Sequence, residues 1–190
     1  ELIQIGKEQS LIPASYLNIA LGPLVQTWRI GFSDARIPNN AEVTHALSLT
    51  DPQFIELDPL SCTVFLAKEG MKLDLGCLAK GYIADKIADY LKSQHVDSAL
   101  INLGGNIKTI GDNVLADRPW QIGIQDPRQP RGTNLAVLPI CNQSVVTSGT
   151  YERKLQVKGR TYHHILDRKT GYPVETQLAS ITIISDNSLD

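Results

Sequence analysis

Four short segments of the sequence are richer in glycine, carboxylate and histidine than a protein core requires. Glycine lets a backbone approach a ligand closely, while carboxylate and histidine side chains can move protons. These residue types therefore mark the segments as candidates for binding or catalysis. They are residues 72–82, 102–106, 146–153 and 162–173.

The first segment, residues 72–82, has a carboxylate, small residues and a lysine where a helix is predicted to begin. Backbone N–H groups and the helix dipole would point at a bound anion there, and Lys80 would add a positive charge. The segment is not a P-loop, because the pattern GxxxxGK[ST] is absent. The alternative is that Asp74 caps the helix and Lys80 is solvated, and the segment alone favours this plainer interpretation.

Two other segments carry weaker signals. Gly104 and Gly105 would let a backbone approach a ligand, although a Gly-Gly turn between strands is more often a simple hairpin. The hydroxyl side chains before Gly149 could bind phosphate oxygens, or they could form a polar turn. Ser148 has neither a GxSxG elbow nor a base near it in sequence, which argues against a serine hydrolase.

The fourth segment contains adjacent histidines. His163 and His164 lie on a predicted strand, so they point to opposite faces and do not form a chelating pair. One of them would face the core or a cleft. A lone histidine is more often a structural hydrogen-bonding group than a catalyst, and Asp167 could simply start the turn that Gly171 and Pro173 complete.

A mixture of helices and strands must position these segments. Periodicity predicts a long helix over residues 76–93, and proline and capping signals predict short helices over residues 22–28 and 41–47. The first 40 residues are expected to hold only short, broken elements. Strands are predicted over residues 53–57, 63–67, 98–103, 107–110, 121–125, 135–141, 145–148, 155–157, 161–165 and 178–184. The pattern indicates an α+β fold with mixed, mostly antiparallel sheets and one or two long helices.

Composition excludes several classes of protein. The 190 residues include 18 Lys and Arg against 20 Asp and Glu, and this balance argues against a nucleic-acid binder. A hydrophobic content of 42% is enough for a packed core, and no apolar run is long enough to cross a membrane. The three cysteines have no CxxC spacing, which makes a zinc site or a disulfide framework improbable. The length allows one domain or two tightly joined subdomains.

Together, the segments resemble motifs of the ApbE family of FAD:protein FMN transferases. Residues 21–28 match GPLVxxW, and the other four motifs look like DLGxxAKGY, NxGGN, TSGxYE and HIxDxxTGxP, at residues 74–82, 102–106, 147–152 and 164–173. Five motifs in the family's order are specific, and they cover nearly the whole chain. The resemblance implies a single ApbE-like domain over residues 1–190.

The resemblance also implies phosphoryl transfer that uses FAD and Mg²⁺. The Thr or Ser hydroxyl of an acceptor flavoprotein would attack the FMN-side phosphorus, and AMP would leave. His164 would be the base or orienting group, with Asp167 beside it in the catalytic set, and the backbone carbonyl of Cys77 would be a metal ligand. The implied FAD contacts are Tyr16, Leu17, Asn18, Asp74, Lys80, Gly104, Gly105, Ser148, Gly149, His164 and Ile165.

The sequence departs from the family pattern in two places. Asn18 stands where the family usually has Asp, and the chain stops at Asp190, which we align just short of the family's D-x-x-[ST]-T metal-ligand segment. Because Mg²⁺ needs several oxygen ligands, including a carboxylate, this chain is expected to bind Mg²⁺ poorly and to transfer little FMN. The family's N-terminal segment is also missing. That segment usually carries a lipoprotein signal, so the resemblance implies an extracytoplasmic, membrane-anchored protein.

Three other hypotheses stay open at this stage. A family variant could hydrolyse FAD to FMN and AMP with water as the nucleophile. A non-catalytic flavin-binding protein would bind FAD without Mg²⁺, and His164→Ala would leave its properties unchanged. A structural domain with chance matches would explain none of the five ordered motifs.

Overall fold

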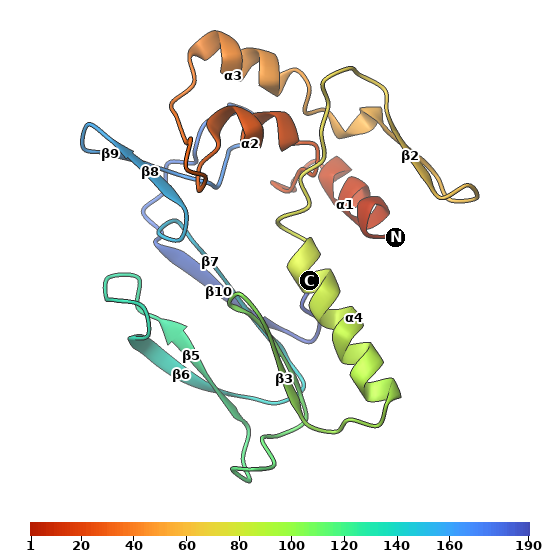
Figure 1. Ribbon diagram of the computed structural model, residues 1–190, viewed down its shortest axis with the longest axis vertical. Coiled ribbons are helices and arrows are strands. Elements are labelled where there is room, and N and C mark those ends of the chain that lie inside the picture. Colours follow the sequence, from red (N-terminus) through yellow and green to blue (C-terminus); the bar gives the residue numbers. More distant parts are fainter. The chain divides into compact units, whose positions relative to one another are not determined.

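Four α-helices, a short 3₁₀ helix and ten strands make up the fold, and every strand pair is antiparallel. The computed structural model describes all 190 residues, and its ribbon is drawn in Figure 1. The elements form two units. The first unit contains Glu1–Cys77 and Thr150–Gln177, and the second contains Leu78–Gly149 and Leu178–Asp190. The predicted α+β class is confirmed.

The first unit combines three helices with two hairpins. Its α2 has a proline in the first turn, a position that proline's fixed φ suits, and α3 begins with a capping box between Asn39 and Glu42. Its elements are α1 (Leu2–Leu11), α2 (Gly22–Trp28), α3 (Asn40–Leu47), the 3₁₀ helix η1 (Pro52–Phe54), β1 (Ile55–Asp58), β2 (Thr63–Leu66), β8 (Lys154–Val157) and β9 (Arg160–His163).

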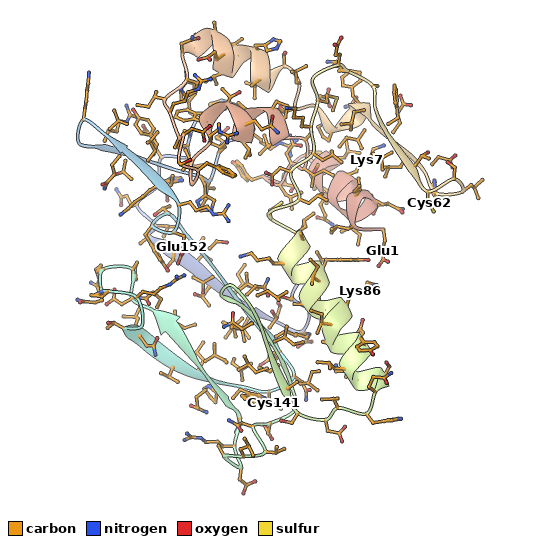
Figure 2. All side chains as sticks on the ribbon, in the orientation of Figure 1. Glu1, Lys7, Cys62, Lys86, Cys141 and Glu152 are labelled. Atoms are coloured by element: carbon orange, nitrogen blue, oxygen red, sulfur yellow. The ribbon has the colours of Figure 1, made fainter.

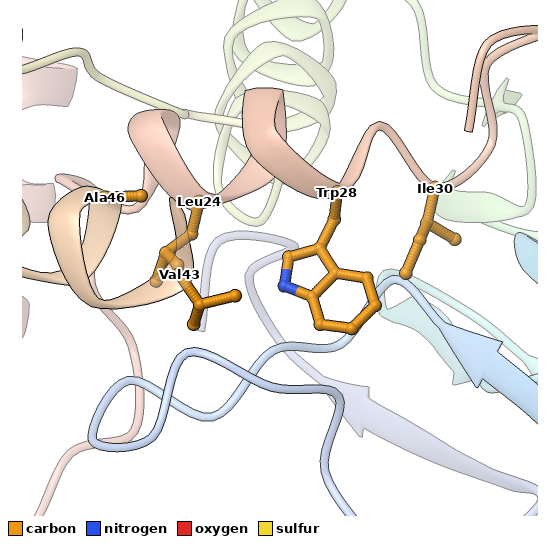
Figure 3. Packing of buried hydrophobic residues seen from close by; sticks show 5 residues of the cluster. All are labelled: Leu24, Trp28, Ile30, Val43 and Ala46. Atoms are coloured by element: carbon orange, nitrogen blue, oxygen red, sulfur yellow. The ribbon is translucent and has the colours of Figure 1, made fainter. Parts of the chain in front are cut away.

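A hydrophobic core lies where α2 packs on α3 (Figure 3). Trp28, which is 1% exposed, is the largest side chain in it. Its ring lies 5.7 Å from the rings of both Tyr162 and Tyr172. The core therefore joins the N-terminal helices to the later part of the chain. The buried members of this core are Leu24, Trp28, Ile30, Val43 and Ala46.

The structure contains one helix that was not predicted, and two predicted elements begin later than expected. Helix α1 was not predicted, because Gly6 weakens its helical signal, yet Gly6 and Ser10 are buried and the Ser10 hydroxyl donates to the Gly6 carbonyl. The strand expected over residues 53–57 begins at Ile55 instead, because Asp51 caps the preceding 3₁₀ turn. The long helix begins at Ala79 rather than residue 76.

The second unit is built on a four-stranded sheet in the order β10-β7-β4-β3. Helix α4 packs on one face through Ala84 and Ala88, and the β5–β6 hairpin packs on the other through Ile122 and Ile140. Its elements are α4 (Ala79–Ser93), β3 (Ala99–Leu103), β4 (Asn106–Ile110), β5 (Trp120–Gln125), β6 (Asn134–Ile140), β7 (Ser144–Gly149) and β10 (Ser180–Ser185).

A buried ion pair ties the C-terminal residues to α4 in the second unit. The ammonium of Lys108 on β4 lies 3.5 Å from the carboxylate of Asp85, and these side chains are 6% and 20% exposed. The same carboxylate accepts hydrogen bonds from the backbone N–H groups of Ser188 and Leu189, at 2.8 and 2.9 Å. Buried charges need such partners, so the pair fixes the chain beyond β10 on α4.

The three cysteines form no disulfide. Figure 2 shows Cys62 in the turn that joins β1 to β2, and Cys141 at the end of β6. None of the helices has the length and apolar character that crossing a bilayer requires.

Candidate functional site

Helix α2 begins against the segment that carries Asp74. A Cβ atom on Gly22 would lie 2.5 Å from the Lys72 carbonyl oxygen, so only glycine allows this close approach. The Asp74 N–H donates to the Ile19 carbonyl at 2.8 Å. As a result, the residues predicted to contact FAD in two distant stretches, around Asn18 and at Asp74, lie next to each other in the first unit.

A cavity of about 200 Å³ opens beside this contact. The guanidinium of Arg29 borders it, pairs with Asp34 at 2.6 Å and lies 5.1 Å from the centre of the Phe32 ring. A carboxylate, a cation and an aromatic ring on one cavity can bind a flat polar molecule by stacking and hydrogen bonds. The cavity is lined by Gly22, Val25, Gln26, Arg29, Phe32, Leu73 and Asp74.

The plainer interpretation of this segment, that Asp74 caps the long helix, is wrong. Helix α4 begins at Ala79, and its N-cap residue, Leu78, makes no side-chain cap. Instead, the Asp74 carboxylate accepts from the N–H of Gly76 at 2.8 Å. One carboxylate oxygen thus orders the local turn, while the residue also lines the cavity.

His164 lies in a second hollow, which also borders α2. It lines this hollow of about 20 Å³ with Val25, Trp28, Ile30 and Leu166, and Val25 lines both this hollow and the cavity beside Asp74. Nδ1 of His164 is 3.3 Å from the Arg153 carbonyl oxygen, which can only accept. The proton therefore sits on Nδ1, and Nε2 is the basic nitrogen of the neutral ring.

The environment keeps this imidazole neutral. Burial lowers the pKa of His164 below its usual value of 6.5, and the positive charge of Arg153 and the neighbouring His163 lower it further. The hydrogen bond to Arg153 and the charge of Glu152 raise the pKa of His164, but the net shift is still downward. At neutral pH His164 therefore has the protonation state that a general base requires.

His163 has a different role. Its Nε2 lies 2.8 Å from the Val174 carbonyl, and its Nδ1 lies 3.3 Å from the Ile165 N–H. Both ring nitrogens are thus occupied by backbone groups, and Ile165, which was predicted to contact FAD, is the residue that His163 orders.

Asp167 builds a turn. Its carboxylate oxygen accepts from the N–H groups of Lys169 and Thr170 at 2.6 and 2.9 Å, and its carbonyl accepts from Gly171 at 2.8 Å. Gly171 has φ +76°, and the Trp28 indole N–H donates to its carbonyl at 2.9 Å. The geometry supports the turn that the sequence offered as an alternative to a catalytic role for Asp167.

The segment before α2 turns Asn18 inward. Asn18 is buried, its amide nitrogen donates to the Thr50 carbonyl at 2.8 Å, and its amide oxygen accepts from the Ala20 N–H at 2.9 Å. Leu17 is half-buried, whereas Tyr16 is 70% exposed. The Asn18 side chain therefore holds the segment, and Tyr16 is the side chain it presents.

Cys77 and its surroundings give an incomplete metal site. Burial of the sulfur, and then the charge of Asp74, raise the pKa of the Cys77 thiol, so this thiol is not a thiolate ligand near neutral pH. Mg²⁺ prefers a near-octahedral set of oxygen ligands. No group of three His, Cys, Asp or Glu residues in the 190 residues is placed to hold a metal. The Cys77 carbonyl and the nearby Asp74 do not by themselves satisfy the ion.

The remaining predicted site residues belong to the second unit. Lys80 is exposed in the first turn of α4. Gly104 and Gly105 have φ values of +63° and +90° in the β3–β4 turn, and no protein atom lies within 4 Å of where their Cβ atoms would be. Space is therefore open beside both residues, although the Gly105 N–H already donates to the Asn102 side-chain oxygen at 3.0 Å. On β7, Ser148 is exposed and Gly149 is buried.

Sequence reasoning missed the parts of the site that are backbone atoms or apolar side chains. The Arg153 carbonyl, which selects the His164 tautomer, has no signature in residue type. The sequence analysis included Trp28 in the GPLVxxW pattern but predicted no role for it in the site.

Comparison with known proteins gives concordant results. A family model described as the ApbE family matches residues 1–190. The FAD:protein FMN transferase of Klebsiella pneumoniae is 48% identical over 190 residues, which are 100% of this chain and 58% of that protein. That of Treponema pallidum is 40% identical over 185 residues, 91% of this chain and 51% of that protein. This chain thus spans little more than half the length of these curated relatives.

Solved structures also match the fold. The ApbE protein of Thermotoga maritima has a TM-score of 0.87 and 31% identity, over 99% of this chain and 60% of that one. The flavinyl transferase ApbE of Pseudomonas stutzeri, in its apo form, has a TM-score of 0.80 and 30% identity, over 99% and 58%.

Proposed function

The chain belongs to the ApbE family, and from this premise we propose that it forms part of an FAD:protein FMN transferase. The relatives named as such enzymes match it over nearly its whole length. The observation that carries the proposal in the structure is the neutral His164, held at Nδ1 by the Arg153 carbonyl in a hollow that shares Val25 with the cavity beside Asp74.

In the proposed reaction, a Thr or Ser hydroxyl of an acceptor flavoprotein attacks the FMN-side phosphorus of FAD. A new P–O bond joins FMN to the acceptor, the bridging P–O bond breaks, and AMP leaves with the bridging oxygen. Nε2 of His164 accepts the hydroxyl proton. The neutral ring and its fixed tautomer suit it to this role without a further rearrangement.

Each unit, taken by itself, carries groups suited to a part of FAD. In the first unit, the cavity with Asp74 and Phe32 would take a planar ring of FAD. In the second unit, the space beside Gly104 and Gly105 would admit phosphate oxygens, and Lys80 would supply a positive charge that favours an anion.

Mg²⁺ belongs to the proposal because the resemblance implies it, with the Cys77 carbonyl as one ligand. When bound at the pyrophosphate, the ion would neutralise charge that develops there. Since residues 1–190 do not complete its ligand set, this stretch alone is expected to bind Mg²⁺ weakly and to transfer little FMN.

The location of the protein is also a proposal. We infer from the family resemblance that it works outside the cytoplasmic membrane as an anchored lipoprotein. Fractionation of cells that produce the natural protein, followed by detection in the membrane and soluble fractions, would test this.

The decisive experiment is the intact mass of an acceptor domain. The natural protein and residues 1–190 alone would each be incubated with FAD, Mg²⁺ and a Thr-containing acceptor, with His164→Ala as a control. A mass gain of one FMN that requires Mg²⁺ and His164 supports the transferase. Release of FMN and AMP without a gain would instead indicate FAD hydrolysis, and neither product would indicate a flavin binder.

A further inference from the structure

Arg168 contacts three backbone carbonyls that are far from it in sequence. Its Nη1 lies 3.0 Å from the Ser10 oxygen, 2.8 Å from the Ser15 oxygen and 3.1 Å from the Leu17 oxygen. All of these residues belong to the first unit. Nothing in the motif HIxDxxTGxP gives this position a role.

These carbonyls need a donor. Ser10 lies in the last turn of α1, where carbonyls have no partner within the helix and the helix dipole is negative. Ser15 and Leu17 lie in the irregular connection between α1 and α2, outside any ladder of backbone hydrogen bonds. One charged guanidinium therefore donates hydrogen bonds both to a carbonyl at the end of α1 and to carbonyls in the connection that follows it.

The turn that carries Arg168 is fixed independently of this connection. Asp167 and Gly171 close the turn, and the buried Trp28 holds it to the core through the Gly171 carbonyl. A Cβ atom on Gly171 would lie 2.8 Å from a methyl carbon of Val43, which shows how closely the turn meets the core. The turn is thus held by its own contacts, and Arg168 adds an anchor for the connection to those that Asn18 and the Ser10 hydroxyl provide.

The connection exposes Ile12, Pro13, Ala14 and Tyr16, and Tyr16 is the aromatic side chain among them. Asn18 is turned inward, and the Leu17 carbonyl is taken by Arg168. Tyr16, between the two anchored carbonyls, is 70% exposed, and the Lys169 ammonium lies 5.9 Å from the centre of its ring. Arg168 on the turn therefore binds the backbone on both sides of Tyr16, while the ring itself stays exposed.

We propose that Arg168 is a positioning residue that holds the connection so that the Tyr16 ring can stack on a planar ring of FAD. The inference rests on the proposed function, because it assigns the stacking partner to FAD. An exposed aromatic ring loses less conformational freedom on binding when its backbone is already fixed.

A double-mutant cycle in the natural protein tests the coupling. FAD affinity would be measured by quenching of flavin fluorescence for the wild type, Arg168→Met, Tyr16→Ala and the double variant. We expect each single variant to weaken FAD binding about tenfold, and the double variant to bind no more weakly than Tyr16→Ala alone. Arg168→Lys should recover part of the affinity, because an ammonium can still donate to carbonyls.

Two controls separate this role from a general loss of structure. Arg160→Met removes a cation that pairs with Glu175 on the surface, and it should leave FAD affinity unchanged. Hydrogen exchange should accelerate over residues 12–18 in Arg168→Met but not over α2. General acceleration would instead indicate a purely structural role and would overturn the inference.

The remaining outcomes are also distinct. Unchanged affinity in Arg168→Met, or effects of the two single variants that simply add, would overturn the inference while the proposed function stands. Absence of FAD binding by the wild type would overturn the proposed function, and the inference with it.

Discussion

Replacing Trp28 with Phe tests how the core of the first unit supports the site. Trp28 is 1% exposed and its indole N–H donates to the Gly171 carbonyl at 2.9 Å. Phe keeps most of the apolar ring but has no donor. The Asp167–Gly171 turn would then keep its backbone bonds and lose its hydrogen bond to the core.

The expected loss of stability has two parts. Leaving the buried Gly171 carbonyl without a donor costs about 1–3 kcal/mol. The smaller ring leaves space in the core, and this adds about 1 kcal/mol, because removal of a whole Trp or Phe ring costs about 3–5 kcal/mol. We therefore expect Trp28→Phe to lower the free energy of unfolding by about 2–4 kcal/mol.

Urea unfolding followed by circular dichroism would measure this loss. Trp120→Phe is the matched control, since the Trp120 N–H is 3.5 Å from the Ile110 carbonyl and the side chain is only half-buried. The control should cost about 1 kcal/mol or less. If both variants lost the same stability, the reasoning from the buried hydrogen bond would be refuted.

Three further predictions concern charge. His164→Ala should slow FMN transfer about 10²–10⁴-fold. Because burial lowers the pKa of His164, the wild-type rate should fall only below pH 6.5. A midpoint above that value in a pH–rate profile would contradict this. Asp85→Ala should cost about 3–5 kcal/mol in urea unfolding, because it leaves the charge of the buried Lys108 with only the Asp186 carbonyl as a partner. Lys108→Met should restore part of the loss, and no restoration would argue against coupling. Arg36 holds the pKa of Glu42 at about 2, so the pair stabilises the fold above about pH 4.5 and stops doing so as the pH falls through 2. Glu42→Gln should therefore lower Tm at pH 7 but not at pH 2. An equal change in Tm at both pH values would rule this out.

Local patterns in the sequence were enough to predict most elements. The long helix has an apolar stripe, and Ile87 and Leu91 of that stripe pack on the sheet core as expected. The Lys158–Gly159 turn joins β8 to β9, which correspond to two neighbouring predicted strands. Such elements depend on neighbours in sequence, so periodicity and turn chemistry report them. Helix α1 was missed because its stability comes from burial of Gly6 and Ser10, which propensity does not include.

The sequence by itself determined the α+β class and the family, because motif residues keep their identity and order along the chain. Only the tertiary structure decided which motif residues face a ligand and which hold the fold. Asn18 and Asp167 bond to backbone groups, whereas Asp74 and His164 line two hollows that share Val25 of α2. The carbonyls that bind Arg168 lie more than 150 residues away from it, and every residue type has a carbonyl. Residue identity therefore cannot indicate such a contact, and only the folded chain brings the donor to its acceptors.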